Sequence, residues 1–583
     1  MGMADHQEVR AQVDRDRLVN HIDEFSLRPK HAGTPTELES LRYVEAQMRA
    51  YGFRTELISH PAYISLPGPA SVWFQGRRLR AITHSFSRPS APEGLKAELV
   101  YVGAGPPEDY AGADVKGRLM LVDGVASPMA SVAAGERGAV GQVHISPHGY
   151  LHEMCISPVW GSPGDDQLAA LPSTVVVSIA AADGAELKAA LDRGPVDLTV
   201  HAEMDTGWRN TPILVADLAS EGEEPDEPFV LFTGHHDTWY LGVMDNGGAN
   251  ATMLEVSRLC AGNRGAWRRG LRVIYWSGHS QGRYSSSAWY ADNNWFELQR
   301  RAVVHINVDS TGGLGNTVVS DTAASAELRA VAREALRQEA SQEYSGRRMQ
   351  RAGDQSFWGI GVPSIFGNMS EQPAQPGEVN ASAAVFGGGA RAGAGTGWWW
   401  HTPDDTRDKI DPDILVRDTR IYLRTVWRLL TEPVLPIDYR EHARELRTVL
   451  EERSRQASPH LDLDPLVEFA ARLESRLTAI YEQAGGGDPA PFNELIRSLS
   501  RALVPIDYTM GDRFRHDPAL DAPAVPALAD CARLAGLQAG SVEALCLASR
   551  LKRAANRVES GLREAMTACD EFAANSGNPA KIC

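Results

Sequence analysis

Three apolar runs in the middle of the chain alternate with helical patterns. FVLFTG (229–234), LRVIYWSG (271–278) and VVHINVDS (303–310) are long enough to form buried strands, and a helical pattern such as Asn250 to Cys260 lies between them. Buried strands that alternate with helices are typical of a mostly parallel sheet with both faces covered. The pattern therefore predicts an α/β fold for this part of the chain.

The region before these runs has a different pattern. A capping box, Thr36 with Glu39, precedes helically spaced apolar residues, and residues 54–63 are predicted to form a strand. From about Pro67 to about residue 205, short β-branched runs alternate with turns rich in Gly and Pro. This alternation indicates a small β-rich module.

Beyond about residue 436 the apolar positions take helical spacing. They include Leu466, Phe469, Leu473, Leu477 and Ile480, and they predict a helical domain joined through Gly485, Gly486 and Gly487. We therefore expect three domains. The first comprises residues 1–60 and 207–435, the second is residues 61–206 inserted within it, and the third is residues 436–583.

Composition narrows the class of partner. The 583 residues carry 75 Asp and Glu against 58 Lys and Arg, a formal net charge of −17, which argues against nucleic acid or an anionic membrane as partner. The chain lacks the ~18-residue apolar run of a membrane span, and its charged N-terminus lacks a secretory apolar segment. We expect a cytoplasmic protein. The six cysteines are too scattered for a disulfide framework or a CxxC metal site.

Polar side chains follow each predicted strand of the sheet. They are His235 and Asp237 after the first run, His279 and Ser280 after the second, and Asp309 at the end of the third. Sites in open α/β sheets form outside the carboxyl ends of the strands, so these side chains are expected to converge. Imidazole and carboxylate together bind Zn²⁺, Mn²⁺ or Fe²⁺. Asp237 is two residues beyond His235, which suits a carboxylate that orients an imidazole.

The order and spacing of five motifs are more specific than any single residue. They are GHHDTW (234–239), MDNGGAN (244–250), WSGHSQG (276–282), HINVDSTG (305–312) and HTPDDT (401–406). Together they resemble the co-catalytic zinc aminopeptidase and glutamate carboxypeptidase family. The resemblance implies a zinc-aminopeptidase-like sheet flanked by helices, with residues 61–206 as an inserted protease-associated domain. It also implies that the C-terminal helices form a dimerisation domain, and hence a homodimer.

The resemblance further implies roles for individual residues. In the family two zinc ions share an aspartate, which matches Asp245. One ion also takes a histidine and an aspartate, which match His235 and Asp309, and the other takes a histidine that matches His401. The family places two adjacent glutamates, a general base and a metal ligand, where this chain has His279 and Ser280.

Two arrangements of this altered site are physically sensible. In the first, which we favour, one ion is held by His235, Asp245 and Asp309, leaving His279 and His401 for proton transfer. In the second, His279 and His401 help Asp245 to hold the ion. We expect one divalent ion per chain, with zinc preferred over manganese or iron.

Three functions remain open at this stage. The first is hydrolysis of an amide-type C–N bond in a small amino-acid-like or aromatic substrate, with His279 as base and Asp237 supporting catalysis. The second is a lyase, isomerase or decarboxylase that uses one metal and a histidine base. The third is an inactive receptor or scaffold.

Predicted substrate contacts are Trp239, Tyr240, Arg283, Trp398, Trp399 and Trp400, although packing at domain interfaces is the commoner use of tryptophan. The glycine-rich residues 386–397 precede Trp398, Trp399 and Trp400, and they are expected either to move as a lid or to be ordinary mobile surface.

Overall fold

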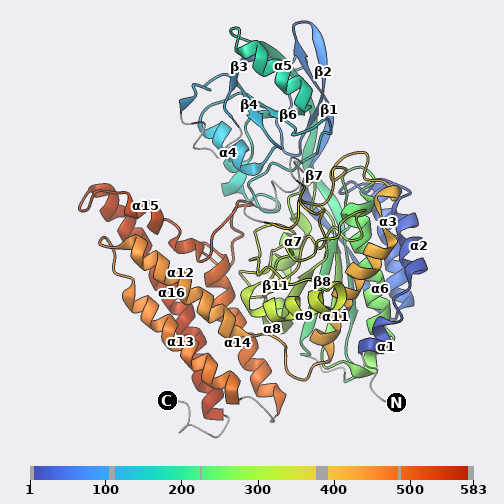
Figure 1. Ribbon diagram of the computed structural model, residues 1–583, viewed down its shortest axis with the longest axis vertical. Helices are drawn as coiled ribbons and strands as arrows, with labels where there is room; N and C mark the ends of the chain where they lie inside the picture. The colour runs from blue at the N-terminus through green and yellow to red at the C-terminus, as the bar shows by residue number, and fades with distance from the viewer. Residues whose placement is uncertain are drawn as a thin grey trace.

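The strands join into one mixed sheet that runs through two parts of the molecule (Figure 1). The computed structural model describes residues 6–103, 110, 112–222, 226–375, 391–483 and 488–575. The sheet order is β1-β2-β6-β5-β4-β3-β7-β9-β8-β10-β11. The strands are β1 Arg54–Phe74, β2 Arg77–Thr83, β3 Leu95–Tyr101, β4 Leu119–Asp123, β5 Gly141–Ile145, β6 Val175–Ile179, β7 Asp197–Leu218, β8 Phe229–His235, β9 Gly270–Trp276, β10 Ala302–Asn307 and β11 Ser364–Ile365.

Helices surround the sheet and fill the C-terminal part. They are α1 His6–Arg10, α2 Arg15–Phe25, α3 Pro35–Ala50, α4 Pro128–Glu136, α5 Ala181–Leu191, α6 Ala249–Ala261, α7 Ser285–Asn293, α8 Trp295–Arg301, α9 Arg329–Ala340, α11 Pro412–Thr431, α12 Tyr439–Ala457, α13 Asp464–Gln483, α14 Pro489–Tyr508, α15 Cys531–Ala535 and α16 Val542–Asn575. None of the helices in the described ranges is long and apolar enough to cross a membrane.

The predicted α/β arrangement of the central sheet is confirmed. Strands β9, β8, β10 and β11 are parallel to one another, whereas β7 pairs antiparallel with β9. On β8, Val230 and Phe232 pack into the core with helices α6 and α11, whereas Phe229 and Leu231 face the opposite core beside α7 and α8. Both faces of the strand are therefore buried, which explains why it is a continuous apolar run rather than an alternating one.

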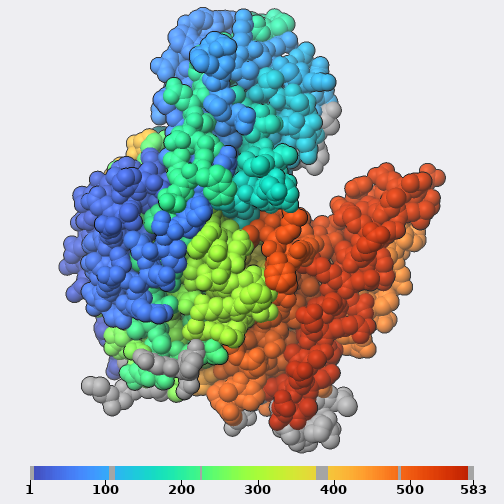
Figure 2. Space-filling view, turned by 180° about the vertical axis from the view of Figure 1, so that it is seen from behind, coloured from blue at the N-terminus to red at the C-terminus, as the bar shows by residue number. Residues whose placement is uncertain are grey.

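The inserted module, residues 61–206, is not joined to the central sheet by flexible linkers. Strands β1 and β7 pair antiparallel from Arg54 with Asp217 to Trp73 with Thr199, with one irregularity between Pro67 and Ala70. The predicted domain boundaries, after residues 60 and 206, fall inside these two strands. The module stands on this ribbon and projects beyond the rest of the molecule (Figure 2).

The helix predicted from the Thr36 capping box is α3, and it begins earlier than the sequence pattern predicts. Thr34, rather than Thr36, is the N-cap of α3, and its side chain accepts a hydrogen bond from the backbone N–H of Glu37. The Glu37 carboxylate in turn accepts from Gly33 N, while Pro35 occupies the first turn. Proline is favoured there because its missing N–H costs no hydrogen bond.

The helical character of the C-terminal region is confirmed, and its helices α12 to α16 lie beside the central sheet domain (Figure 1). The predicted joint at Gly485 to Gly487 lies outside the described residues, as do residues 386–390 of the glycine-rich segment.

A buried ionic cluster joins the C-terminal helices to the rest of the molecule. His442 on α12 has Nδ1 2.8 Å from Glu327 Oε2 and Nε2 3.4 Å from Asp507 Oδ2 on α14. Burial alone would lower the pKa of His442, but the two carboxylates outweigh it and raise the pKa to about 10. The imidazole is therefore charged at neutral pH and pairs with both acids.

We expect His442→Gln to destabilise the protein by about 3–5 kcal/mol, because it leaves the buried Glu327 carboxylate without its cation, while Asp507 keeps its ion pair with Arg348. The folded-state pKa lies above the unfolded value of about 6.5, so this stabilisation is complete below pH 6.5 and declines as pH rises toward 10. Thermal unfolding across this range should show the wild-type midpoint falling more steeply than that of the variant. His460→Gln, beyond the end of the same helix, is the control; parallel curves for wild type and His442→Gln would contradict the assignment.

Candidate metal centre

The predicted convergence of strand ends is present. Strand β8 ends at His235, Asp309 lies two residues beyond β10, and Asp245 lies in a short π-helical turn, η3 Val243–Gly248, ahead of α6. His235 Nε2 is 3.2 Å from Asp245 Oδ1 and 3.8 Å from Asp309 Oδ1. The other carboxylate oxygen of Asp245, Oδ2, is 3.1 Å from His401 Nε2. Asp245 therefore lies between the two imidazoles, with one oxygen facing each.

The atoms in this cluster are arranged for a cation. His235 Nε2 and Asp245 Oδ1 are both buried, and neither makes a hydrogen bond within the described part of the chain. Burial would lower the pKa of His235, but Asp245 and Asp309 reverse this and hold the pKa well above its ordinary value. Burial would likewise raise the pKa of Asp245, but the two imidazoles hold it far below its usual range. The carboxylates thus favour positive charge at this point.

The tautomers of both histidines leave their inner nitrogens free for an ion. His235 Nδ1 lies 2.7 Å from the backbone carbonyl of Asp237, and His401 Nδ1 lies 2.6 Å from that of Glu153. A carbonyl can only accept, so each Nδ1 carries the proton and, in the neutral ring, each Nε2 presents a lone pair to Asp245. A lone pair that faces a carboxylate oxygen is repulsive unless a cation lies between them. One-His, two-carboxylate donor sets suit Zn²⁺, Mn²⁺ or Fe²⁺, so the residues fit a divalent metal.

His279 lies at the edge of this cluster. Among the described residues, His235, His279 and Asp309 present ligand atoms that all lie within 4.8 Å of one another. By distance alone His279 is therefore eligible as a ligand. The His235 and His279 rings are stacked, however, with centroids 3.8 Å apart and planes 11° apart. An imidazole nitrogen holds an ion in the plane of its ring, so two stacked parallel rings are poorly placed to share one ion.

The outer nitrogen of His279 is bound by a buried carboxylate. His279 Nδ1 lies 2.7 Å from Asp354 Oδ2. The Ser287 hydroxyl donates to Asp354 Oδ1 at 2.8 Å and lies 2.9 Å from the Ser356 hydroxyl, which accepts from Trp160 Nε1. Burial would raise the pKa of Asp354, but His279 and Ser287 hold it below its ordinary value. An ionised Asp354 accepts a hydrogen bond from His279 Nδ1–H, which keeps the ring proton on Nδ1 and leaves Nε2 as the basic atom.

Asp237 has a different role from the one the sequence indicates. Its backbone carbonyl, not its carboxylate, meets the His235 ring, and the carboxylate Oδ1 is 3.9 Å from His235 Nδ1. The carboxylate accepts the backbone N–H groups of His279 and Ser280, at 3.1 and 2.8 Å. Asp237 therefore fixes the main chain of the altered pair rather than an imidazole.

Two residues important to the site were not assigned from the sequence. Asp405 accepts hydrogen bonds from Met244 N and Asp245 N, and so fixes the backbone that carries the bridging carboxylate. Asp354 orients His279 as described. The HTPDDT motif contains Asp405, but the motif gives no sign of which aspartate turns inward. Gly248 in MDNGGAN is also required, because a Cβ there would lie 2.1 Å from Thr311 O.

The predicted aromatic substrate contacts are mostly packed in the core. Trp239, Trp399 and Trp400 are only 3–4 % exposed, and Trp400 stacks on His401 with centroids 3.6 Å apart. These side chains pack against the site, and the expectation that they line a substrate pocket stays a prediction. Trp398 is more open, and it stacks on Tyr150 of the inserted module at 4.1 Å.

Tyr240 and Arg283 are engaged within the protein. The Tyr240 hydroxyl donates to Glu153 Oε1 at 2.9 Å. Arg283 donates to the carbonyl of Ala519 at 3.1 Å, and its guanidinium lies over the Tyr284 ring. Arg283 therefore connects the central domain to the C-terminal region, which differs from the predicted contact with a substrate carboxylate.

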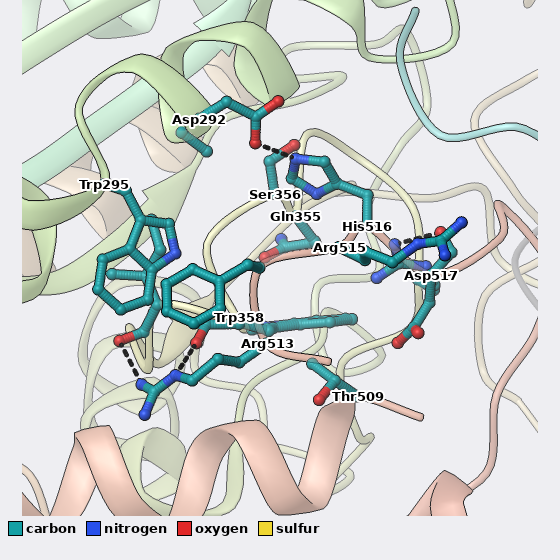
Figure 3. A pocket seen from close by; sticks show the side chains of 15 residues that line it. Asp292, Trp295, Gln355, Ser356, Trp358, Thr509, Arg513, Arg515, His516 and Asp517 are labelled. Carbon is teal, nitrogen blue, oxygen red and sulfur yellow. Dashed lines mark hydrogen bonds and ion pairs between the residues drawn. The ribbon is translucent and has the colours of Figure 1, made fainter. Parts of the chain in front are cut away.

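A small pocket at the seam with the C-terminal helices lies apart from this site (Figure 3). Trp295, Trp358 and Arg513 line it, and Arg513 donates to the carbonyls of Gly359 and Ile360. Its cavity volume of about 20 Å³ holds about one water molecule. It is too small to bind a substrate.

Comparisons with known proteins agree with this geometry. Residues 214–426 match Peptidase family M28. The chain is 24% identical over 501 residues to a probable glutamate carboxypeptidase VP8 of Zea mays, covering 72% of this chain and 67% of that protein. It is 22% identical over 362 residues to a probable glutamate carboxypeptidase AMP1 of Arabidopsis thaliana, covering 50% of each.

Solved structures show the same fold. An aminopeptidase from Aneurinibacillus sp. strain AM-1 superposes with a TM-score of 0.53 at 21% identity, covering 74% of this chain and 98% of that one. A zinc aminopeptidase from Bacillus subtilis gives a TM-score of 0.54 at 18% identity, covering 72% and 96%. The fold and site together define a metal-dependent, hydrolase-like scaffold with a divalent metal site, for which zinc is the typical ion. The Peptidase family M28 match within the chain, the glutamate carboxypeptidase-like relatives and the aminopeptidase structures together support the co-catalytic zinc aminopeptidase-like family.

Proposed function

We propose that the protein is a metal-dependent hydrolase that cleaves an amide-type C–N bond in a small amino-acid-like or aromatic substrate, with His279 as the base. One observation carries this proposal. The outer nitrogen of His279 is bound to the buried Asp354 carboxylate, while the ring lies against His235. A histidine oriented by a carboxylate beside a metal site is arranged to accept a proton from an attacking water.

The ion and three side chains have separate roles in the proposed reaction. A divalent ion held at this site supplies polarisation of the substrate carbonyl and acidification of water. His279 Nε2 accepts the proton of the attacking water, and Asp354 stabilises the resulting imidazolium through Nδ1. The same imidazolium then donates its proton to the departing nitrogen. Asp237 keeps His279 in place through the backbone N–H groups of residues 279 and 280.

We further propose one ion per chain. His235 Nε2 lies 3.2 Å from Asp245 Oδ1 and 3.8 Å from Asp309 Oδ1, which supports one ion position beside His235. By the family resemblance, Ser280 takes the place of the glutamate that binds the second ion, and it offers a neutral hydroxyl, a weaker ligand for Zn²⁺ than a carboxylate. The loss of this carboxylate lowers the affinity of any second metal position. His401 faces the other oxygen of Asp245, and in this proposal it is a further ligand of the same ion rather than of a second one.

The remaining proposals concern substrate and assembly. Trp398, stacked on Tyr150 and with Lys409 Nζ 5.5 Å from its ring centroid, supports contact with an aromatic or acidic part of a small substrate. A homodimer through the C-terminal helices rests on the family resemblance. Consistent with this, Val542 and Leu545 near the start of α16 are 79% and 59% exposed.

Reaction in ¹⁸O-labelled water tests the chemistry directly. Zinc-loaded protein is incubated with a panel of N-acyl amino acids and dipeptides. We expect it to cleave at least one of them, and mass spectrometry should show one ¹⁸O atom in the carboxylic acid product. Protein carrying Asp245→Asn should give no product. A product formed without gain of ¹⁸O would contradict hydrolysis and support elimination, isomerisation or decarboxylation at the same site. Substoichiometric metal together with no turnover of any compound would support the inactive scaffold.

A further inference from the structure

A loop of the inserted module is hydrogen-bonded to the segment that carries His401. His152 Nδ1 lies 2.6 Å from the Trp400 carbonyl, His401 Nδ1 lies 2.6 Å from the Glu153 carbonyl, and Glu153 N donates to the His401 carbonyl at 3.0 Å. The two segments are 248 residues apart in the chain. The hydrogen-bond acceptor of His401 Nδ1 thus comes from the inserted module and not from the central sheet.

The proton positions along this loop follow from its acceptors. The Trp400 carbonyl can only accept, so His152 carries its proton on Nδ1 and has a lone pair on Nε2. Tyr150 N donates to His148 Nδ1 at 3.3 Å, so His148 carries its proton on Nε2. That nitrogen lies 3.3 Å from His152 Nε2. A directed series therefore runs from Tyr150 through His148 and His152 to the backbone beside His401.

This loop has no regular secondary structure to fix it. Residues 147–154 lie outside every helix and strand, so the loop is held by hydrogen bonds to neighbouring segments, which involve both its side chains and the backbone N–H of Glu153. His152 is 2 % exposed and points at the Trp400 carbonyl. The Glu153 carboxylate accepts from the Tyr240 hydroxyl, and Tyr150 stacks on Trp398. The loop thus holds both central segments that flank the metal centre.

We propose that His152 is a positioning residue through which the inserted module fixes His401 for metal binding. Its Nδ1–H holds the carbonyl that precedes His401, while the next residue of the loop holds the His401 ring through Nδ1. An imidazole whose outer nitrogen is fixed in this way presents the other nitrogen to an ion in one orientation. The inference rests on the proposed metal site and adds that the affinity of this site depends on the module.

Metal affinity of the full chain, measured with Co²⁺ by competition against a chelator, tests the proposal. We expect His152→Ala to weaken Co²⁺ binding by about 10–100-fold, the usual effect of removing a partner of a ligand. His152→Asn should retain near-wild-type affinity, because the Asn amide nitrogen stands where Nδ1 does and can donate to Trp400. His152→Gln places its amide farther out, and we expect it to behave as His152→Ala does.

Two further variants separate positioning from general destabilisation. His144, buried in β5 and 3.1 Å from Gln142 Oε1, is the matched control, and His144→Ala should leave Co²⁺ affinity unchanged. His148→Ala, at a half-buried site that tolerates change, should weaken binding by about two- to tenfold through loss of one hydrogen bond, and it serves if His152→Ala does not fold. Equal affinity of wild type, His152→Ala and His148→Ala would overturn the proposal, as would an equal loss in His144→Ala. Failure of the wild type to bind Co²⁺ would instead overturn the metal site itself, and this inference with it.

Discussion

Replacing Asp245 with Asn is expected to abolish metal binding and to lower turnover by about a thousandfold or more, since metal catalysis contributes several kcal/mol. Asp245 faces His235 with one oxygen and His401 with the other, at 3.2 and 3.1 Å. Asn keeps the volume but offers one weak acceptor, and its NH₂ group places hydrogens where a cation would lie. The variant therefore loses charge and a ligand atom without creating a cavity.

Elemental analysis of protein purified without chelator measures the first effect. We expect about one ion per wild-type chain and almost none in Asp245→Asn. Asp192→Asn, an exposed aspartate at the end of α5, is the matched control and should keep its ion. Two ions per wild-type chain would contradict the mononuclear site, and retained metal in Asp245→Asn would contradict the bridging role.

Replacing His279 with Ala is expected to lower turnover by about 10²–10⁴-fold, the usual contribution of a general base, while the metal stays bound. Asp354→Asn should cause a similar loss by a different route. The Asn amide would donate to His279 Nδ1, which moves the ring proton to Nε2 and removes the basic lone pair.

A double variant tests whether the two residues act as one unit. If they do, His279→Ala with Asp354→Asn loses no more activity than His279→Ala alone, because groups that act together are strongly non-additive. Asp292→Asn on α7, where the exposed carboxylate pairs with His516, controls for a nearby loss of charge. Loss of metal in His279→Ala would make His279 a ligand, and additive losses would separate Asp354 from it.

The sequence was sufficient for those features that depend on local pattern. The strands at 229–235, 270–276 and 302–307 were predictable because strands buried on both faces are continuous apolar runs. The meeting of His235 and Asp309 was predictable because parallel strands end at one edge of the sheet. The cap at Thr34 was missed because Thr36 and Glu39 offer the same spacing two residues later.

The features that the sequence did not reveal depend on contacts between distant segments. Asp237 accepts from backbone groups 42 and 43 residues away, so the short spacing to His235 pointed to the wrong partner for its carboxylate. Asp405 acts on a backbone about 160 residues away. The burial of Trp399 and Trp400 depends on how the central domain closes around them, which the WWW run alone does not determine.

The paired strands β1 and β7 affect how a substrate can reach the site. A domain on a flexible linker can rotate aside to admit a ligand. A two-stranded ribbon that is paired from Arg54 to Trp73, with one irregularity between Pro67 and Ala70, is much stiffer than such a linker. The loop with His152 stands on that ribbon, so opening the site requires movement of side chains near Trp398 rather than rotation of the whole module. The same ribbon constrains chimeric proteins. If the inserted module is exchanged between relatives, the register of β1 against β7 must be kept, because a shift would move the loop away from His401.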